Sequence, residues 1–260
     1  MFLREKVDFW TFWEIIKTLR GEKGCPWDKK QTPETLKKYL IEETYEVLEA
    51  IEKGEPNGIR EELGDLLFLV LFIIYLYDEK NFFKLEDLLY YTSQKMIKRH
   101  PHVFGEEKVK SAEEVVTNWQ KIKEKEGKGS SVLGNIPKSL PALQRAYRIG
   151  ERAGRVGFDW EKPEEVLEKF EEELQEIKEL LKTGKKEKLK EEIGDLIFTI
   201  ANFSRKLNFN PEEALKLALN KFERRFNLLE EELKKRNLNW GKLSLKELDQ
   251  IWEEIKSKEI

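Results

Sequence analysis

Two short acidic phrases of the chain combine residue types and a spacing that suit the binding of a cation. EETYE covers positions 42 to 46 and EELGD covers positions 61 to 65. Residues three or four apart lie on the same face of a helix, so each phrase would present a pair of carboxylates on one face. The paired residues are Glu43 with Glu46 and Glu62 with Asp65.

The turn between the two phrases predicts where these carboxylates meet. GEPNG, at positions 54 to 58, has a length that joins antiparallel neighbouring helices. Four converging carboxylates repel one another and cost free energy to desolvate unless a cation compensates their charge. Oxygen-only ligation suits Mg²⁺, with Mn²⁺ as the alternative. The sequence therefore predicts a magnesium site.

Iron is the main competing metal. Ferritin-like bundles also carry glutamates on facing helices, but they combine them with the pattern Glu-x-x-His. The two histidines of this chain, His100 and His102, both lie in KRHPHVFG at 98 to 105, outside the acidic phrases. We expect them to be turn or surface residues, which favours magnesium over iron.

The acidic arrangement occurs a second time. EEELQE covers positions 171 to 176, and EEIGDLIF begins at 191, which is 130 positions after EELGDLLF begins at 61. In a chain with 51 Asp and Glu residues, a single such phrase is most simply a solvated helix face. The joint occurrence of both phrases around a short turn, found twice, favours a metal site instead. The candidate ligands of the second copy are Glu173, Glu176, Glu192 and Asp195.

The elements that must position these acids are helices. Apolar residues recur with the helical period along most of the chain, and Gly and Pro fall between the periodic segments. Thr32 before Pro33 is a helix start signal, and Gly54 is a stop signal. We therefore predict an all-α fold. The helices expected in the first half cover positions 5–20, 33–53, 58–78, 84–99 and 111–126.

The repeat also predicts the domain organisation. QKMIKRH at 94 to 100 matches NKFERRF at 220 to 226, and NWQKIKEKE at 118 to 126 matches IWEEIKSKE at 251 to 259. Between the copies, KEKEGKGSS is charged and rich in Gly and Ser, which is typical of a linker. We expect an N-terminal domain at 1–126, a linker at 127–135 and a C-terminal domain at 136–260.

Composition excludes some classes of protein. Charged residues make up 38% of the chain with a net charge of −3, so the chain lacks the basic excess of a dedicated nucleic-acid binder. Cys25 is the single cysteine, which fits a reducing cytoplasm.

The apolar run at 66 to 77 has 12 residues, short of the roughly 20 needed to span a membrane. We expect it to form a helix buried in a core or against a partner subunit.

The acidic phrases occur together with further short motifs, namely GCPWDKKQT (24–32), KRHPHVFG (98–105), VGFDW (156–160) and KFERRF (221–226). Taken together, they resemble the MazG family of nucleoside triphosphate pyrophosphohydrolases along essentially the full chain. The resemblance implies two tandem MazG-type helical-bundle domains that form four-helix bundles by dimerisation. It also implies a homodimer that hydrolyses NTPs and dNTPs, with broad base specificity and Mg²⁺, to the monophosphate and pyrophosphate.

The resemblance implies roles for residues around the second acidic cluster. Glu172 could orient or deprotonate a metal-bound water, with a solvated helix position as its alternative role. Lys221 and Arg225 lie four apart on one helix face and would contact phosphates. Further nucleotide-binding candidates are Lys169, Lys188, Lys190, Glu191, Arg224 and Trp252. Trp252 would pack either against the nucleotide or into a core.

The two copies differ beside the acids. Lys169 and Lys188 of the second copy correspond to Tyr39 and Gly58 of the first. Because lysines help to hold a triphosphate, and because the family usually uses its C-terminal unit, we expect the second copy to be the main catalytic one. The first copy keeps candidate nucleotide contacts in Lys95, Arg99 and Trp119.

Two other functions remain open from the residues alone. The chain could be a nucleotide-sensing module without turnover, or a helical scaffold whose acids keep it in solution. The chain contains no P-loop motif and no Rossmann glycine pattern, so any chemistry on phosphates would have to use a metal.

Overall fold

The computed structural model describes residues 8–126, 131–134 and 136–258. It divides into two compact units, residues 1–122 and 123–260. The part of the chain that the structure describes contains helices and no strand, so the predicted all-α fold is confirmed. The predicted boundaries at 126 and 136 remain predictions, and positions 127–130 and 135 of the expected linker lie outside the described residues.

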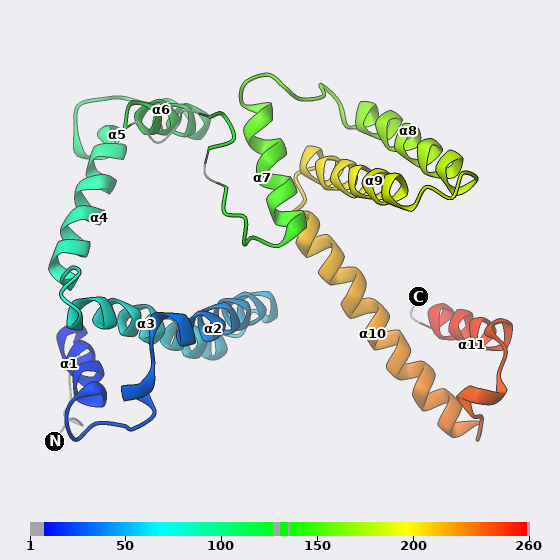
Figure 1. The fold of residues 1–260 in the computed structure, drawn as a ribbon, viewed down its shortest axis with the longest axis horizontal. Coiled ribbons are helices and arrows are strands. Elements are labelled where there is room, and N and C mark those ends of the chain that lie inside the picture. The colour runs from blue at the N-terminus through cyan, green and yellow to red at the C-terminus, as the bar shows by residue number, and fades with distance from the viewer. Residues whose placement is uncertain (1–7, 127–130, 135, 259–260) are drawn as a thin grey trace. The chain divides into compact units, whose positions relative to one another are not determined.

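The first half of the chain contains a set of helices that Figure 1 shows in blue to green. They are α1 (Phe9–Arg20), α2 (Pro33–Lys53), α3 (Pro56–Glu79), α4 (Leu85–Arg99), α5 (Pro101–Phe104) and α6 (Ala112–Lys125), with a 3₁₀ turn η1 (Asp28–Lys30). The helices expected from the sequence agree with these bounds within a few residues. The expected start of the first helix, at 5, lies outside the described residues.

Local signals explain where α2 begins and ends. The Oγ1 atom of Thr32 accepts a hydrogen bond from the backbone N–H of Thr35, and the Thr35 hydroxyl in turn accepts one from the N–H of Thr32, which forms a capping box. Pro33 occupies the first helical position, where its missing N–H costs nothing. Gly54 ends the helix with a φ of 68°, a conformation that glycine adopts without strain.

The core of the first unit forms where α1 and α2 pack on α3. Trp13, Ile16 and Leu36 are buried against Phe72 and Leu76 of the apolar run. The run is therefore largely a core helix, as expected. Its outer side is exposed in the isolated chain, with side chains such as Leu67 and Val70 at 45% and 40% relative exposure.

The second half repeats the pair of packed helices that α2 and α3 form in the first half, here called a helical hairpin. Its helices are α7 (Ala142–Gly154), α8 (Pro163–Leu181), α9 (Lys186–Lys206), α10 (Pro211–Lys235) and α11 (Leu245–Ser257), with a 3₁₀ turn η2 (Trp240–Lys242). The helices α8 and α9 run side by side, α7 packs on α9, and α11 packs on α10 (Figure 1). A separate small core between α10 and α11 is formed by Leu229, Leu233, Ile251 and Ile255.

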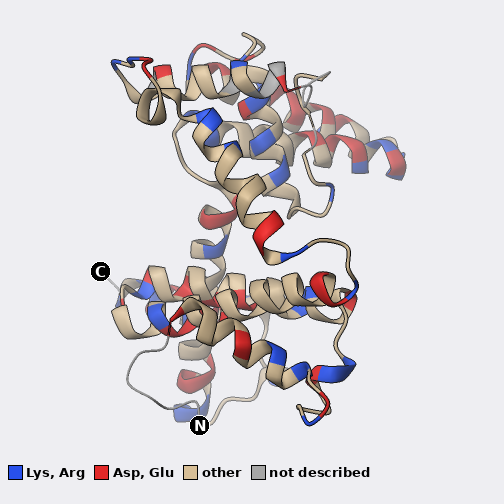
Figure 2. Cartoon of the chain, turned by 90° about the vertical axis from the view of Figure 1, so that its left-hand side faces the viewer, with Lys and Arg blue, Asp and Glu red and all other residues tan. Residues whose placement is uncertain are grey.

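Charged residues of both signs are distributed over the helices, as Figure 2 shows for Lys and Arg against Asp and Glu. The chain has 48 basic and 51 acidic residues, so neither sign is in large excess. Among the helices that could be searched, none combines the length and the apolar character that a membrane span requires.

Candidate metal centre

The hairpin of α8 and α9 brings three acids of the second copy together. Glu173 and Glu176 come from α8 and Glu192 comes from α9, and each offers a carboxylate oxygen within 4.8 Å of the others. Glu173 is nearly inaccessible to solvent, at 5% exposure. Such a cluster could bind a divalent cation through oxygen ligands.

The electrostatics of this cluster favour a cation. Desolvation raises the pKa of Glu192, and a hydrogen bond with Glu176 and the charges of Glu176, Glu173 and Asp195 raise it further. Asp195 lies outside the group of three, but its charge acts on Glu192. A bound cation would remove the repulsion that makes ionisation of Glu192 unfavourable.

Lys169 lies one helical turn before Glu173 on α8. Its Nζ atom is 2.8 Å from Oε1 of Glu173 and 2.8 Å from Oε1 of Glu172. Hydrogen bonds to Glu172 and then to Glu173 raise the pKa of Lys169. The lysine thus supplies one positive charge to the acidic cluster. Glu172 is exposed and paired with this lysine, and its role with water remains a prediction.

The first copy forms a similar cluster on α2 and α3. Glu43, Glu62 and Asp65 each offer a carboxylate oxygen within 4.8 Å of the others. Desolvation raises the pKa of Glu43, and the charge of Glu46 is the next largest cause. The Oε2 atom of Glu43 is buried and accepts no hydrogen bond from any described residue. This unsatisfied oxygen fits a cation ligand, so the residues of both copies fit a divalent metal.

The remaining nucleotide-binding candidates of the second copy lie on α9, α10 and α11. Lys188, Lys190 and Glu191 are exposed on α9, just before Glu192. Lys221, Arg224 and Arg225 lie on α10, a helix that packs on α7, α9 and α11. Their contacts to phosphate remain predictions.

Trp252 lies on α11 and is half-buried against the small core of α10 and α11. Its ring centroid is 5.2 Å from that of Phe222 on α10. This packing accounts for Trp252 as a core residue, whereas its contact with a nucleotide remains a prediction.

The candidate nucleotide contacts of the first copy have partners of their own. The ammonium group of Lys95 lies 5.6 Å from the ring centroid of Tyr91. Arg99 is buried at 7% exposure near the end of α4. Trp119 lies 6.2 Å, ring to ring, from His100, which joins α4 to α5 and is half-buried. Their roles with nucleotide remain predictions.

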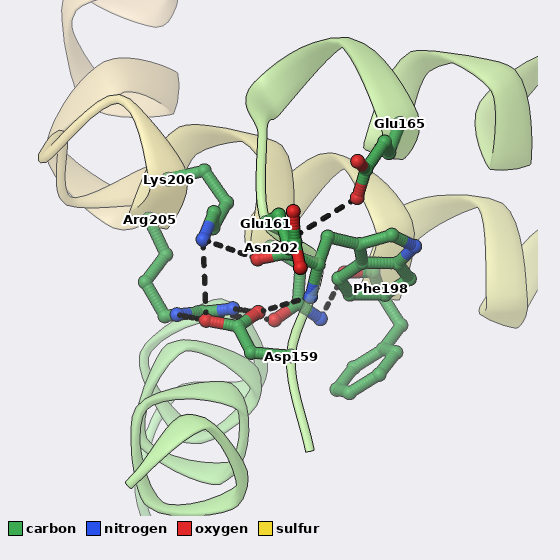
Figure 3. Close-up of polar contacts among 8 residues, drawn as sticks. Asp159, Glu161, Glu165, Phe198, Asn202, Arg205 and Lys206 are labelled. Atoms are coloured by element: carbon green, nitrogen blue, oxygen red, sulfur yellow. Dashed lines mark hydrogen bonds and ion pairs between the residues drawn. The ribbon is translucent and has the colours of Figure 1, made fainter. Parts of the chain in front are cut away.

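A partly buried polar network in the second unit has no counterpart among the sequence predictions. Arg205 on α9 donates to Asp159 through Nη1 at 3.0 Å and Nη2 at 2.5 Å, and Lys206 donates to the carbonyl oxygen of Trp160 at 2.6 Å (Figure 3). The hydrogen bond from Arg205 is the main reason that the pKa of Asp159 is lowered. The available signals were the quoted phrase VGFDW at 156–160 and a pair of cations at the end of α9, Arg205 and Lys206, of which Arg205 is 46 positions further along the chain than Asp159.

Comparison with known proteins shows similarity across both units. A family model described as the MazG nucleotide pyrophosphohydrolase domain matches residues 31–104 and 161–228. A protein of Thermotoga maritima named nucleoside triphosphate pyrophosphohydrolase/pyrophosphatase MazG is 46% identical over 244 residues, which cover 93% of each chain. The nucleoside triphosphate pyrophosphohydrolase of Escherichia coli is 40% identical over 252 residues, or 95% of this chain and 96% of that protein. The uncharacterized protein YabN of Bacillus subtilis is 42% identical over 97% of this chain and 52% of its own length. Both acidic clusters fall within the residues that the family model matches.

Proposed function

Because the chain belongs to the MazG nucleotide pyrophosphohydrolase family, we propose that it hydrolyses nucleoside triphosphates, including deoxynucleotides with different bases, to the monophosphate and pyrophosphate in the presence of Mg²⁺. The observation that carries the proposal is the convergence of Glu173, Glu176 and Glu192 in the second copy, where three carboxylates come within 4.8 Å. A triphosphate is itself an anion, so an acidic site accepts it only together with cations.

The acids Glu173, Glu176, Glu192 and Asp195 would hold the metal, with Mn²⁺ as an alternative to Mg²⁺. Bound there, a divalent cation supplies charge compensation for phosphate oxygens and lowers the pKa of a coordinated water. The chain's own contribution is to hold these carboxylates on two packed helices, which reduces the reorganisation needed when substrate arrives.

Basic residues of the chain would position the phosphates. Lys169 already faces the acids, since it pairs with Glu172 and Glu173. Lys188 and Lys190 lie near the N-terminal end of α9, directly before the acids of that helix. Glu172 is the candidate that accepts the proton of the attacking water, because it is exposed and adjacent to the buried ligand Glu173.

The second copy is proposed as the main catalytic one. Both copies have three converging acids, but only the second has a lysine paired with them among the described residues. The first copy has Tyr39 at the position of Lys169, and the ring of Tyr39 packs against Trp27. Its acids would bind a cation but would contribute less to holding a triphosphate.

We also propose that the hairpins dimerise. The outer side of α2 and α3 exposes apolar side chains at helical spacing, and α9 does the same. The exposed apolar residues of these stripes include Ile41, Tyr45, Leu48, Leu63, Leu67, Val70, Ile193, Ile197 and Ile200. A second copy of the chain would cover these stripes by completing a four-helix bundle around each hairpin.

Product analysis tests the proposed activity. The full chain is incubated with ATP and Mg²⁺, and the nucleotides and phosphates are then separated. AMP with pyrophosphate is the expected result, while ADP with orthophosphate would indicate a different hydrolase. Unchanged ATP, together with an unchanged panel of dNTPs, would leave a nucleotide-sensing module as the better account.

A further inference from the structure

The two acidic clusters use equivalent positions but differ in the charge beside one glutamate. In the second copy this glutamate is Glu173, which is buried at 5% exposure. Its Oε1 atom lies 2.8 Å from the ammonium group of Lys169, which is also 2.8 Å from Oε1 of Glu172. The buried carboxylate that a divalent cation would use therefore already has a counter-ion from the chain itself.

The equivalent glutamate of the first copy, Glu43, has different surroundings. Tyr39 occupies the position of Lys169, and its ring centroid lies 5.9 Å from that of Trp27. The neighbouring Lys38 places its Nζ atom 4.4 Å from the centroid of the Tyr39 ring. The Oε2 atom of Glu43 is buried and accepts no hydrogen bond from any described residue. The first cluster thus has a buried oxygen without a donor where the second has an ammonium group.

An ammonium group and a divalent cation compete for the same carboxylate. A cation held by Glu173, Glu176 and Glu192 would be repelled by the positive charge of Lys169 at this distance. A buried carboxylate oxygen without a donor has the opposite effect, because a bound cation offsets the cost of its desolvation. The two arrangements therefore favour a free cation in the first copy and disfavour it in the second.

A triphosphate would change this balance in the second copy. Lysine carries its ammonium group on a flexible four-carbon chain. The side chain of Lys169 is 37% exposed, so the ammonium group can turn from Glu173 towards an anionic ligand. Phosphate oxygens would then receive the lysine, and Glu173 would be free for the cation that accompanies them. The same lysine would oppose a cation alone and favour a cation with a nucleotide.

We propose that Lys169 makes cation binding in the second copy depend on the nucleotide, whereas the first copy binds a divalent cation without nucleotide. The inference rests on the proposed function, because it takes the anionic ligand of the second copy to be a triphosphate. It gives the two clusters different roles: the first holds a resident cation, and the second takes its cation together with the substrate.

Binding of Mn²⁺ to the full chain tests the difference between the clusters. Free Mn²⁺ is measured by electron paramagnetic resonance without nucleotide, so the result does not depend on hydrolysis. Glu192→Gln leaves the acids of the first cluster intact, and Glu62→Gln leaves those of the second intact. We expect Mn²⁺ to bind about tenfold more tightly to Glu192→Gln than to Glu62→Gln, which is the order of one hydrogen bond to a charged group.

The nucleotide should reduce this difference. The probe is α,β-methylene-ATP, which resists cleavage at the reacting bond, and Mn²⁺ bound by the probe itself is subtracted. Its addition should tighten Mn²⁺ binding to Glu62→Gln by about tenfold, because phosphate oxygens then compete for the lysine. The same addition should change Mn²⁺ binding to Glu192→Gln less.

Exchanging the residue beside the glutamate tests the lysine itself. In the Glu62→Gln background and without nucleotide, Lys169→Met should tighten Mn²⁺ binding by about tenfold, because it removes the ammonium group. A gain in affinity is not the effect of a damaged fold. Lys169→Arg is the matched control, since it retains the charge and should keep the weaker binding. In the Glu192→Gln background, Tyr39→Lys should weaken Mn²⁺ binding.

The outcomes separate this inference from the proposed function. Tighter Mn²⁺ binding to the second cluster than to the first without nucleotide, or unchanged binding in Lys169→Met, would overturn the inference and leave the proposed hydrolysis standing. Failure of the wild type to bind Mn²⁺, with or without the nucleotide analogue, would overturn the proposed metal-dependent function as well.

Discussion

The ammonium group of Lys169 lies 2.8 Å from Oε1 of Glu173, one turn further along α8. In the first copy the same two positions hold Tyr39 and Glu43, and the Oε2 atom of Glu43 is buried without a hydrogen-bond donor from the described residues. The acids of the two copies are thus equivalent in sequence but differ in their electrostatic surroundings. A substrate that is itself anionic would be bound better where a lysine accompanies the acids.

Replacing this lysine should therefore weaken substrate binding in the second copy. We expect Lys169→Tyr, which copies the first unit, to raise the KM for ATP by about tenfold, the effect of losing one hydrogen bond to a charged group. Steady-state kinetics measure the change. The matched control is Tyr39→Lys in the first copy, which should leave the KM nearly unchanged. An unaltered KM in Lys169→Tyr would contradict the proposed role.

The ion pair between Asp159 and Arg205 should contribute strongly to stability. Its side chains are only 18% and 11% exposed, so removing one partner leaves a largely buried charge without its counter-ion. We expect Asp159→Asn to lower the free energy of unfolding by about 3 kcal/mol. Urea denaturation measures the loss. The control is Glu49→Gln, which breaks the exposed pair with Lys53 and should cost less than about 1 kcal/mol. Similar losses in the two variants would contradict this account.

The same aspartate predicts how stability depends on pH. Arg205 lowers the pKa of Asp159 in the folded state below its ordinary value of 3.8. The unfolded chain therefore binds a proton more readily, and the stabilisation is complete above the ordinary value and is lost as the pH falls through the folded-state pKa. The stability difference between the wild type and Asp159→Asn should shrink over this acidic range. A difference that stays constant with pH would show that the carboxylate charge is not its cause.

The exposed apolar stripes lead to a prediction about oligomeric state. Leu67 and Ile197 occupy equivalent positions and are 45% and 46% exposed. A charge at both positions would be buried on dimerisation, so Leu67→Lys combined with Ile197→Lys should convert a dimer to a monomer. Light scattering after size-exclusion chromatography gives the mass. Leu245→Lys is the control, because Leu245 is 83% exposed at the start of α11. A wild-type monomer, or a dimer that survives the double change, would refute the proposed interface.

The sequence predicted the fold well where local chemistry determines it. Thr32, Pro33 and Gly54 act within one turn of the chain, so the ends of α2 could be predicted from them. The convergence of Glu173 with Glu192 followed from a short turn between two helices. These features depend on contacts between near neighbours in sequence.

Other features depend on tertiary packing and could not be predicted in the same way. Asp159 and Arg205 are 46 positions apart, and their pairing requires α7 and α9 to pack together. The pattern of its own helix allowed Trp252 to pack either against a nucleotide or into a core. Its contact with Phe222 depends on how α11 packs on α10. In each case the partner lies on another element, the segment between α7 and α8 for Asp159 and α10 for Phe222, which periodicity along one helix does not identify.

The central claim is that the acidic cluster of the second copy carries the reaction. The rate of AMP release from ATP, compared between Glu192→Gln and its counterpart Glu62→Gln, tests it most directly. We expect Glu192→Gln to lower the rate by about 100-fold or more, because loss of a residue that merely supports a metal ligand already costs about 10- to 100-fold. Glu62→Gln should keep most of the activity. Activity that survives in Glu192→Gln and disappears in Glu62→Gln would contradict the claim and assign catalysis to the first copy.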